Sequence, residues 1–214
     1  MSMKGFSIKT EIEEYDTFEQ YAAQAGLGPE DLVLCGEHTY DKYVAPLSLG
    51  TQTLFREKYG KGEPTDGMVD AILDALREKE FNRIIAIGGG TVVDIAKVVA
   101  VAGKEDKVDN LYDHVDSLKK VHPLVIIPTT CGTGSEVTNI SVINRVSKGV
   151  KMGLASNGML ADKAVMITDM LDSLPYKIFA TSSIDAMVHS VESFLSPNGC
   201  SISEIFSAEA LKTI

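Results

Sequence analysis

The chain has 214 residues, of which 44% are hydrophobic and 23% are charged, with 18 glycines, 7 prolines and no tryptophan. This is the composition of a globular protein of about one to one and a half domains, which excludes collagen-like, disordered and disulfide-scaffold classes. Thirty acidic residues against twenty basic ones give a formal net charge of −10, which opposes a general attraction to nucleic acid or anionic lipid.

The cysteines and the apolar runs indicate a compartment. Cys35, Cys131 and Cys200 are odd in number, far apart and without metal-type spacing, as in proteins of a reducing environment. Residues 1–15 carry charges throughout and lack the apolar core of a signal peptide. Lys97 interrupts the best candidate for a membrane span. We therefore expect a cytoplasmic protein without a membrane partner.

Short apolar runs alternate with amphipathic stretches along most of the chain. Runs at residues 32–35, 53–55, 83–87, 124–127 and 165–167, most of them rich in Val, Ile and Leu, are predicted as buried strands. Residues 64–79 predict a helix with Pro64 at an early helical position, and residues 92–102 predict another. This alternation predicts an α/β fold with right-handed crossovers and a mostly parallel sheet.

The pattern changes after Asp169. Residues 178–195 predict one long helix without a strand partner, residues 196–199 (SPNG) a break, and residues 201–214 a second helix. Because Ala186, Met187 and Val188 are apolar, we expect the long helix to be largely buried. The chain is predicted to divide into an α/β domain, residues 1–175, and the first part of a helical domain, residues 176–214.

A glycine turn follows the predicted strand at residues 83–87. Residues 88–91 (GGGT) lead directly into the next predicted helix. Backbone N–H groups at a helix N-terminus, with no side chains in the way, suit a diphosphate. The alternative is a tight turn that binds nothing, but three consecutive glycines exceed what such a turn needs. For Asp94, one turn into the helix, a ligand role and a simple helix-start charge are equally compatible with the pattern.

A second loop, residues 128–138 (PTTCGTGSEVT), follows the predicted strand at residues 124–127. Threonine hydroxyls both donate and accept hydrogen bonds, which suits ribose and phosphate oxygens. The alternative is a loop in which Thr133 or Ser135 caps a helix that starts near Glu136. Together with the glycine turn the loop predicts two rims of one crevice. We interpret Cys131 as a small packed residue and not as a nucleophile.

Asp185 and His189 lie four residues apart in the long predicted helix, so both fall on one face. A carboxylate and an imidazole at this spacing can reach one divalent metal ion. The alternative is an Asp–His hydrogen-bonded pair, which the residues alone favour, because a metal site usually needs three or more protein donors. The segments around His38, His114 and His122 do not place these side chains to complete a shell.

Together these segments resemble the iron-containing (group III) alcohol dehydrogenase family. The likeness extends from about residue 30 to the end and is carried by residues 88–94 (GGGTVVD), 128–138 and 185–189 (DAMVH). It implies a Rossmann-like parallel-sheet domain followed by an all-helical domain, the dehydroquinate synthase-like architecture, with the active site between them. Within the family, residues 55–60 (FREKYG), 129–134 and 174–177 (LPYK) are most similar to NAD-dependent 4-hydroxybutyrate dehydrogenases.

The resemblance assigns cofactor roles. Diphosphate contacts are implied for Gly89, Gly90 and Thr91. Hydroxyl contacts around the diphosphate and the nicotinamide ribose are implied for Thr129, Thr130, Thr133 and Thr138. Lys151, at the end of a hairpin-like segment at residues 142–151, matches a lysine that reaches the cofactor ribose. Glu37 falls where the family often has an acid, more often Asp, that faces the adenosine ribose and favours NAD over NADP.

The resemblance also implies a metal and a reaction. Asp185 and His189 match the first two ligands of an Fe²⁺ or Zn²⁺ ion that polarises the alcohol oxygen while hydride passes to NAD. In the family, two further histidine ligands and a proton-relay histidine follow later in the helical domain, C-terminal to the position that matches Ile214. We therefore interpret the 214-residue chain as an N-terminal fragment or a natural truncation, and expect it to bind dinucleotide but to bind metal poorly and catalyse little.

Alternative functions stay open. The chain is predicted to act on a small alcohol or aldehyde, with 4-hydroxybutyrate and succinate semialdehyde as the first choice. A glycerol dehydrogenase or a general short-chain alcohol dehydrogenase of the same superfamily is the alternative among enzymes. A nucleotide-binding fragment without catalysis is the alternative outside them. Exposed apolar helix faces would favour a homo-oligomer.

Overall fold

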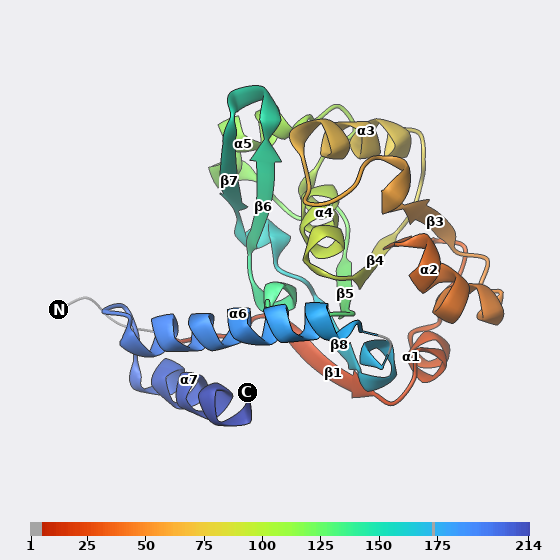
Figure 1. Ribbon diagram of the computed structural model, residues 1–214. Coiled ribbons are helices and arrows are strands. Elements are labelled where there is room, and N and C mark those ends of the chain that lie inside the picture. The colour runs from red at the N-terminus through yellow and green to blue at the C-terminus, as the bar shows by residue number, and fades with distance from the viewer. Residues whose placement is uncertain (1–5, 173) are drawn as a thin grey trace.

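The computed structural model describes residues 6–172 and 174–214 (Figure 1). Within them, six strands form one parallel sheet in the order β1-β8-β5-β4-β2-β3, and β6 and β7 form an antiparallel hairpin. The sheet consists of β1 (Glu11–Tyr15), β2 (Asp31–Cys35), β3 (Gln52–Phe55), β4 (Arg83–Gly88), β5 (Leu124–Pro128) and β8 (Lys163–Ile167). The helices are α1 (Phe18–Ala25), α2 (Glu37–Thr39), α3 (Asp66–Leu76), α4 (Gly90–Val101), α5 (Val108–Asp113), α6 (Tyr176–Leu195) and α7 (Ser201–Thr213).

Apart from the first residues, Asp31 of β2 and Arg83 of β4, the central strands are apolar because both faces of the sheet are covered. In β4, Ile84 and Ala86 belong to the core beneath α3 and α4, whereas Ile85 and Ile87 belong to the core on the other face, with Phe18 of α1. All five residues of β2 and of β5 are buried. All five predicted strands are present and the parallel α/β fold is confirmed. A strand buried on both faces shows no alternation of polar residues, which is why the central strands could be recognised. In β3 only Leu54 is buried, so the expectation of a buried strand at residues 53–55 was wrong, because β3 is an edge of the sheet.

The two helices predicted within the α/β part are also present. Helix α3 begins later than predicted: Thr65 is its N-cap, accepting a hydrogen bond from the Met68 backbone N–H at 3.2 Å. Pro64 therefore precedes the cap, and its prediction as an early helical residue was wrong. The threonine hydroxyl satisfies one free N–H of the first turn, so the helix starts where that acceptor is available.

Strand β1 and helix α1 were not predicted. Strand β1 is a sheet edge that pairs only with β8, and its residues are exposed or half-buried. Its sequence contains three glutamates, so it lacks the apolar run by which the other strands were recognised. In the fold, Lys163 of β8 forms ion pairs with Glu11, at 3.7 Å, and with Glu13. Charged edge strands are common because charge discourages pairing with other chains.

The predicted hairpin-like segment at residues 142–151 is a longer hairpin of β6 (Ile140–Arg145) and β7 (Val150–Ala155). Its tip is a single 3₁₀ turn closed by Gly149 at φ 64°. Strand β6 also contacts the segment before α3, where the Asn144 N–H donates to the Pro64 carbonyl at 2.9 Å. The hairpin thus extends beside α3 and α5 (Figure 1).

Helices α6 and α7 lie along one border of the α/β part and pack on each other (Figure 1). Of the 20 residues of α6, Ser190 alone is buried, so the prediction that this helix is largely buried was wrong. Its apolar side chains are exposed, Ile184 at 58% and Leu195 at 73%. The contact between α6 and α7 includes a hydrogen bond of 2.9 Å between the Ser193 and Ser207 hydroxyls. The predicted boundary after residue 175 lies at the first residue of α6 and remains a prediction.

Among the described residues, no helix is long and apolar enough to cross a bilayer. The first five residues of the segment predicted to lack a signal peptide lie outside the described part of the chain.

Candidate functional site

The two predicted loops begin side by side at the carboxyl edge of the sheet. In the register of β4 and β5, Gly88 is paired with Pro128, so the glycine turn and the threonine-rich loop start at the same level. The Thr129 backbone N–H donates to the Gly88 carbonyl at 3.2 Å, which joins them. Ligands of parallel α/β sheets bind at this edge, where strands end and helices start.

Each glycine of the turn has its own structural reason. A Cβ at Gly88 would lie 2.6 Å from Val92 Cγ2, so the close packing of α4 on β4 requires glycine there. A Cβ at Gly89 would lie 3.1 Å from Thr130 Cγ2, which places the two loops in contact. A Cβ at Gly90 would meet nothing within 4 Å. The turn is thus tightly packed behind and open at Gly90.

The open side is the N-terminus of α4. Its N-cap is Gly89, which has no side chain to satisfy the first N–H groups of the helix. A hollow of about 290 Å³ lies next to it, lined by Glu63, Pro64, Gly90, Thr91, Asp94, Val142 and Lys151. The free donors and the helix dipole make this an environment for an anion. The arrangement also brings Lys151, predicted from resemblance, to the glycine turn.

Lys151 carries the positive charge of this hollow. Its Nζ lies 2.8 Å from Glu63 Oε1, and both side chains are more than half exposed. An exposed ion pair of this kind contributes about 0–1 kcal/mol, so a ligand anion can compete for the ammonium. Thr91, also on the hollow, donates its hydroxyl to the Gly62 carbonyl at 3.3 Å.

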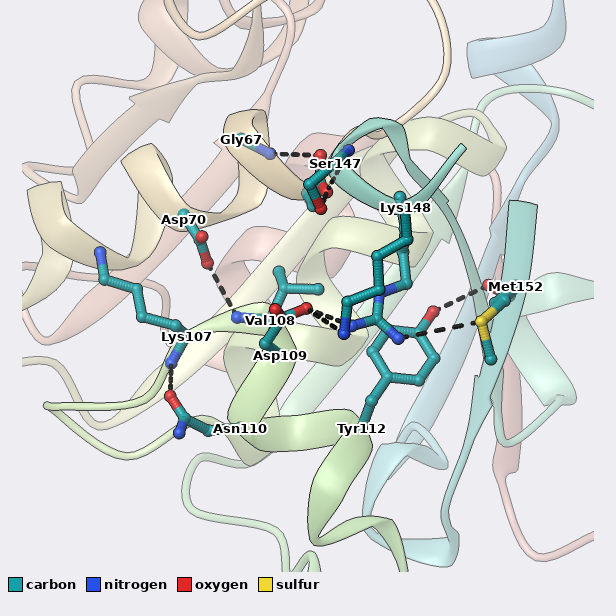
Figure 2. A network of polar contacts seen from close by, with 12 residues as sticks. Gly67, Asp70, Lys107, Val108, Asp109, Asn110, Tyr112, Ser147, Lys148 and Met152 are labelled. Carbon is teal, nitrogen blue, oxygen red and sulfur yellow. Dashed lines mark hydrogen bonds and ion pairs between the residues drawn. The ribbon is translucent and has the colours of Figure 1, made fainter. Parts of the chain in front are cut away.

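The hairpin that carries Lys151 is anchored to α5 by a polar network (Figure 2). Arg145 is buried, forms an ion pair with Asp109, and lies over the Tyr112 ring at 4.3 Å from its centroid. The Tyr112 hydroxyl donates to the Met152 carbonyl at 2.8 Å. Because Met152 is the neighbour of Lys151, these contacts fix the base of the residue that reaches the hollow.

The tip of the hairpin is bound to both α3 and α5. The Ser147 backbone N–H donates to Asp66 Oδ2 at 3.1 Å, and Lys148 Nζ lies 3.3 Å from Asp109 Oδ1 (Figure 2). Burial alone would raise the pKa of Asp66, but hydrogen bonds from Ser147, Gly67 and Val146 outweigh it and hold that pKa below its ordinary value. The carboxylate is thus kept charged at the start of α3, where the helix dipole favours it.

A buried lysine lies beneath the two loops. Lys97 of α4 is 0% exposed, and its Nζ donates to Ser135 Oγ at 2.9 Å, Thr138 Oγ1 at 2.9 Å and the Ile140 carbonyl at 2.8 Å. Burial lowers the pKa of Lys97 to about 8. In the sequence this residue stood out only because it interrupts the best candidate for a membrane span. Its position on the otherwise apolar face of a buried helix is the signal that could have identified it.

Asp94 completes the same network. Its carboxylate accepts hydrogen bonds from Ser135 Oγ and from the Val142 N–H, each at 3.2 Å. Burial raises the pKa of Asp94, against the opposing effect of the Val142 hydrogen bond and of Lys97. Asp94 therefore joins α4, the threonine-rich loop and the hairpin, a third role beside the two that its sequence position left open.

The four predicted threonines differ in their surroundings. Thr129 and Thr130 are half-buried beside the glycine turn, as described above. Thr133 is exposed, and its Oγ1 accepts from the Ser135 N–H at 3.3 Å. Thr138 Oγ1 accepts from Lys97 and donates to the Ser135 carbonyl at 3.3 Å. After Gly134 the chain makes one 3₁₀ turn, Ser135–Val137. This turn takes the place of the helix that the alternative interpretation of the loop would start near Glu136.

Glu37 begins α2, directly after the end of β2, at the same sheet edge. Its side chain is exposed and makes no hydrogen bond or ion pair with the residues that the structure describes. The structure therefore places Glu37 at the predicted edge without a contact that fixes its carboxylate.

Helix α6 contacts the threonine-rich loop at Gly132. Gly132 has φ +107°, and a Cβ there would lie 2.2 Å from the Ser182 carbonyl oxygen and 3.3 Å from Ala186 Cβ. Cys131 is half-buried, with its Sγ 3.5 Å from Ser182 Oγ, which agrees with a packed residue. Asp185 precedes Ala186, so the predicted metal pair lies on the turn of α6 that adjoins this loop.

Asp185 and His189 present one oxygen and one nitrogen donor on the same helix face. His189 Nδ1 lies 3.9 Å from Asp185 Oδ2, too far for the hydrogen-bonded pair considered as an alternative. Their side chains are 50% and 56% exposed. Within residues 6–172 and 174–214 no group of three or more His, Cys, Asp or Glu side chains could hold a metal ion. The pair fits two positions of a metal shell and does not close one.

Comparisons with known proteins identify relatives that match most of the chain. The family model described as iron-containing alcohol dehydrogenase matches residues 10–168. The chain is 39% identical over 212 residues to a 4-hydroxybutyrate dehydrogenase from Clostridium kluyveri, covering 99% of this chain and 57% of that protein. A 4-hydroxybutyrate dehydrogenase from Cupriavidus necator is 32% identical over 139 residues, which are 63% of this chain and 36% of that protein.

Solved structures give the same result. An iron-containing alcohol dehydrogenase from Thermotoga maritima superposes with a TM-score of 0.81 at 27% identity, covering 97% of this chain and 59% of the other. A sulfoacetaldehyde reductase from Bifidobacterium kashiwanohense, solved in complex with NAD+, has a TM-score of 0.84 at 23% identity, covering 99% of this chain and 58% of the other. That second likeness shows the shared fold. The chain thus spans less than two thirds of the length of these relatives.

Proposed function

This chain belongs to the iron-containing alcohol dehydrogenase family, and on that premise we propose that it binds NAD at the carboxyl edge of the sheet. The observation that carries the proposal is the N-terminus of α4, which has no side-chain cap, is open at Gly90 and adjoins the hollow that holds Lys151. A diphosphate at this place accepts hydrogen bonds from the first N–H groups of the helix, and the ammonium neutralises part of its charge.

The predicted threonines of the second loop, residues 128–138, also support this binding mode. Thr129 and Thr130 border the glycine turn, and threonine hydroxyls can both donate to and accept from phosphate and ribose groups, which supports the proposal. The network of Lys97 and Asp94 fixes Thr138 and Ser135 from below. The loop therefore needs little rearrangement when a dinucleotide binds, which reduces the entropic cost of binding.

As an activity we propose hydride transfer between NAD and a small alcohol or aldehyde, with 4-hydroxybutyrate and succinate semialdehyde as the substrate pair. The identity of 39% to a 4-hydroxybutyrate dehydrogenase supports this choice over glycerol or a general alcohol. Asp185 and His189 would supply two donors to an Fe²⁺ or Zn²⁺ ion, which polarises an alcohol oxygen when bound. The described residues close no shell, so we derive no catalytic step through the metal.

Gly90→Ala tests the binding site. A methyl group at residue 90 meets no protein atom within 4 Å. It replaces a helical glycine, so we expect stability to stay constant or to rise by about 0.5–1 kcal/mol. The methyl group nevertheless occupies the approach to the helix N-terminus, so the dissociation constant for NAD, measured by calorimetric titration, should rise at least tenfold, about 1.4 kcal/mol.

Gly67→Ala is the matched control. Gly67 is also a helical glycine with nothing within 4 Å of an added Cβ, but it lies in α3, outside the lining of the hollow. It should gain the same stability and bind NAD as the unmodified chain does. Equal NAD affinity of Gly90→Ala and Gly67→Ala would exclude the diphosphate position proposed here.

A nucleotide-binding module without catalysis is the second candidate, because the metal pair lacks further donors among the described residues. Metal analysis together with NAD titration separates the two. NAD binding without stoichiometric iron or zinc supports the module, whereas one bound iron or zinc per chain supports the enzyme. A panel of 4-hydroxybutyrate, glycerol, butanol and lactaldehyde, assayed on a chain as long as the relatives, tests the substrate.

A further inference from the structure

Strand β2 ends next to the strand that carries the glycine turn. In their register Cys35 is paired with Ile87, so Gly36 follows beside Gly88. In dinucleotide-binding sheets, the end of the strand next to the glycine turn holds the carboxylate that accepts a hydrogen bond from the adenosine ribose. Here the residue at that level is a glycine, which offers no side chain.

A carboxylate from the turn that follows β3 fills the space next to Gly36. Glu57 lies in the single turn that follows β3, and β3 is the other neighbour of β2. A Cβ at Gly36 would lie 2.5 Å from Glu57 Oε1 and 3.5 Å from its carboxyl carbon. The Glu57 carboxylate therefore occupies the place that a side chain of residue 36 would take, and it is 40% exposed to solvent.

The pKa of Cys35, at the buried end of β2, is affected by the nearby Glu57 carboxylate. Burial, with the charges of Glu57 and Asp41, raises the pKa of the Cys35 thiol to about 12. Glu57 is the larger of the two charge effects. Glu37, the acid that follows Gly36 in sequence, is not among the charges that raise this pKa, and its side chain makes no hydrogen bond or ion pair with the described residues.

We propose that Glu57, in place of Glu37, is the specificity-determining carboxylate for the cofactor. It accepts the hydrogen bond of the adenosine 2′-hydroxyl of NAD and repels the 2′-phosphate of NADP, and Gly36 leaves the room that its side chain needs. This inference rests on the proposed function, because it takes for granted that a dinucleotide binds across β2 and β4.

A neighbouring cation gives the proposal a second consequence. Arg56 Nη2 lies 3.8 Å from Glu57 Oε1, while Arg56 Nη1 donates to the Gly60 carbonyl at 3.3 Å. An arginine at this position can hold a 2′-phosphate once the acidic neighbour is neutral. Loss of the Glu57 charge should therefore weaken NAD binding and strengthen NADP binding at the same time.

The test compares Glu57→Gln with Glu37→Gln in the 214-residue chain. Each variant and the unmodified chain are titrated with NAD+ and with NADP+. Both glutamates are exposed, so neither change threatens the fold. We expect Glu57→Gln to weaken NAD+ binding about tenfold and to strengthen NADP+ binding, since hydrogen bonds to a charged acceptor exceed those to a neutral one. Glu37→Gln should leave both affinities within about twofold, the size of an exposed charge effect.

A second variant tests the geometry. The methyl group of Gly36→Ala displaces the Glu57 carboxylate, so NAD+ binding should fall although Glu57 is present. In the double variant with Glu57→Gln the loss should be no larger than in either single variant, because both changes remove one interaction. Additive losses, or a Glu57→Gln chain that binds NAD+ as before, would overturn the assignment of Glu57.

The outcomes also separate this inference from the proposed function. A folded, unmodified chain that binds no NAD+ overturns both. A chain that binds NAD+ and loses affinity in Glu37→Gln but not in Glu57→Gln keeps the proposed function and returns the role to Glu37.

Discussion

Helices α4 and α6 share a high apolar content but have opposite surroundings. Both are rich in apolar residues, yet nine of the twelve residues of α4 are buried against one of the twenty of α6. Helix α4 lies between the sheet and the β6–β7 hairpin, whereas α6 meets α7 and one loop (Figure 1). Hydrophobicity thus indicates what a helix can bury, but its neighbours decide what it does bury.

The difference extends to the polar residues of the two helices. In α4, Lys97 is buried and Asp94 is half-buried, and both have fixed partners. In α6, Asp185 and His189 are half exposed and 3.9 Å apart. Enclosed polar groups cost several kcal/mol when a partner is lost, and exposed ones cost little. The two helices should therefore respond very differently to substitution.

The largest expected effect is that of Lys97→Met. Methionine fills the space of the lysine stem but leaves Ser135 Oγ, Thr138 Oγ1 and the Ile140 carbonyl without the donor they share. We expect a loss of about 4 kcal/mol in the free energy of unfolding, measured in urea at pH 7. A loss below 1 kcal/mol would mean that the network contributes little to holding the two loops.

A matched pair of isoleucines tests the comparison directly. Ile95 of α4 is 0% exposed and Ile184 of α6 is 58% exposed. Ile95→Ala opens a cavity in a packed core and should cost about 3.5 kcal/mol. Ile184→Ala should cost no more than about 0.5 kcal/mol, the usual size of a surface substitution. Similar losses in the two urea titrations would contradict the view that α6 stands outside the core.

Gly132→Ala addresses the contact that holds α6 to the threonine-rich loop. Residue 132 has φ +107°, which a residue with a Cβ rarely adopts, and the added Cβ would collide with the Ser182 carbonyl oxygen. We therefore expect the free energy of local unfolding of α6 to fall by about 3 kcal/mol. Amide hydrogen exchange should accelerate in α6 while β4 and β5 keep their protection.

Gly134→Ala is the control in the same loop. Its φ is +61°, but an added Cβ meets nothing within 4 Å. The cost should be the backbone strain alone, about 1 kcal/mol. If both variants changed exchange in α6 equally, the Gly132 contact would not be what fastens this helix.

Apart from the control variants, the smallest expected effect is a dependence of stability on pH. Burial lowers the pKa of Lys97 to about 8, whereas in the unfolded chain the amine keeps its proton up to about pH 10. Between these values the unfolded state binds more protons, so the stability contributed by Lys97 rises with pH. The raised pKa of Cys35 acts in the opposite direction. The difference between the unmodified chain and Lys97→Met removes that effect, and should grow by about 2 kcal/mol from pH 7 to pH 10.

Part of the candidate site could be predicted because it follows strand ends. The glycine turn and the threonine-rich loop each come directly after an apolar run, and parallel strands bring their carboxyl ends to one edge. The partners of these loops could not be predicted in the same way. Lys97 meets Ser135 across 38 residues, and Glu57 meets Gly36 across two neighbouring strands. Neither pairing leaves a local pattern in the sequence.

The sequence by itself determined the α/β class, the buried strands, the glycine turn and the family, because these depend on local composition and on the order of motifs. Tertiary structure alone decided the role of Lys97, the edge strand β1, the exposure of α6 and which carboxylate lies beside Gly36. The reason is physical. Strand and turn formation respond to neighbours along the chain, whereas burial and the pairing of charges depend on which distant segments pack together.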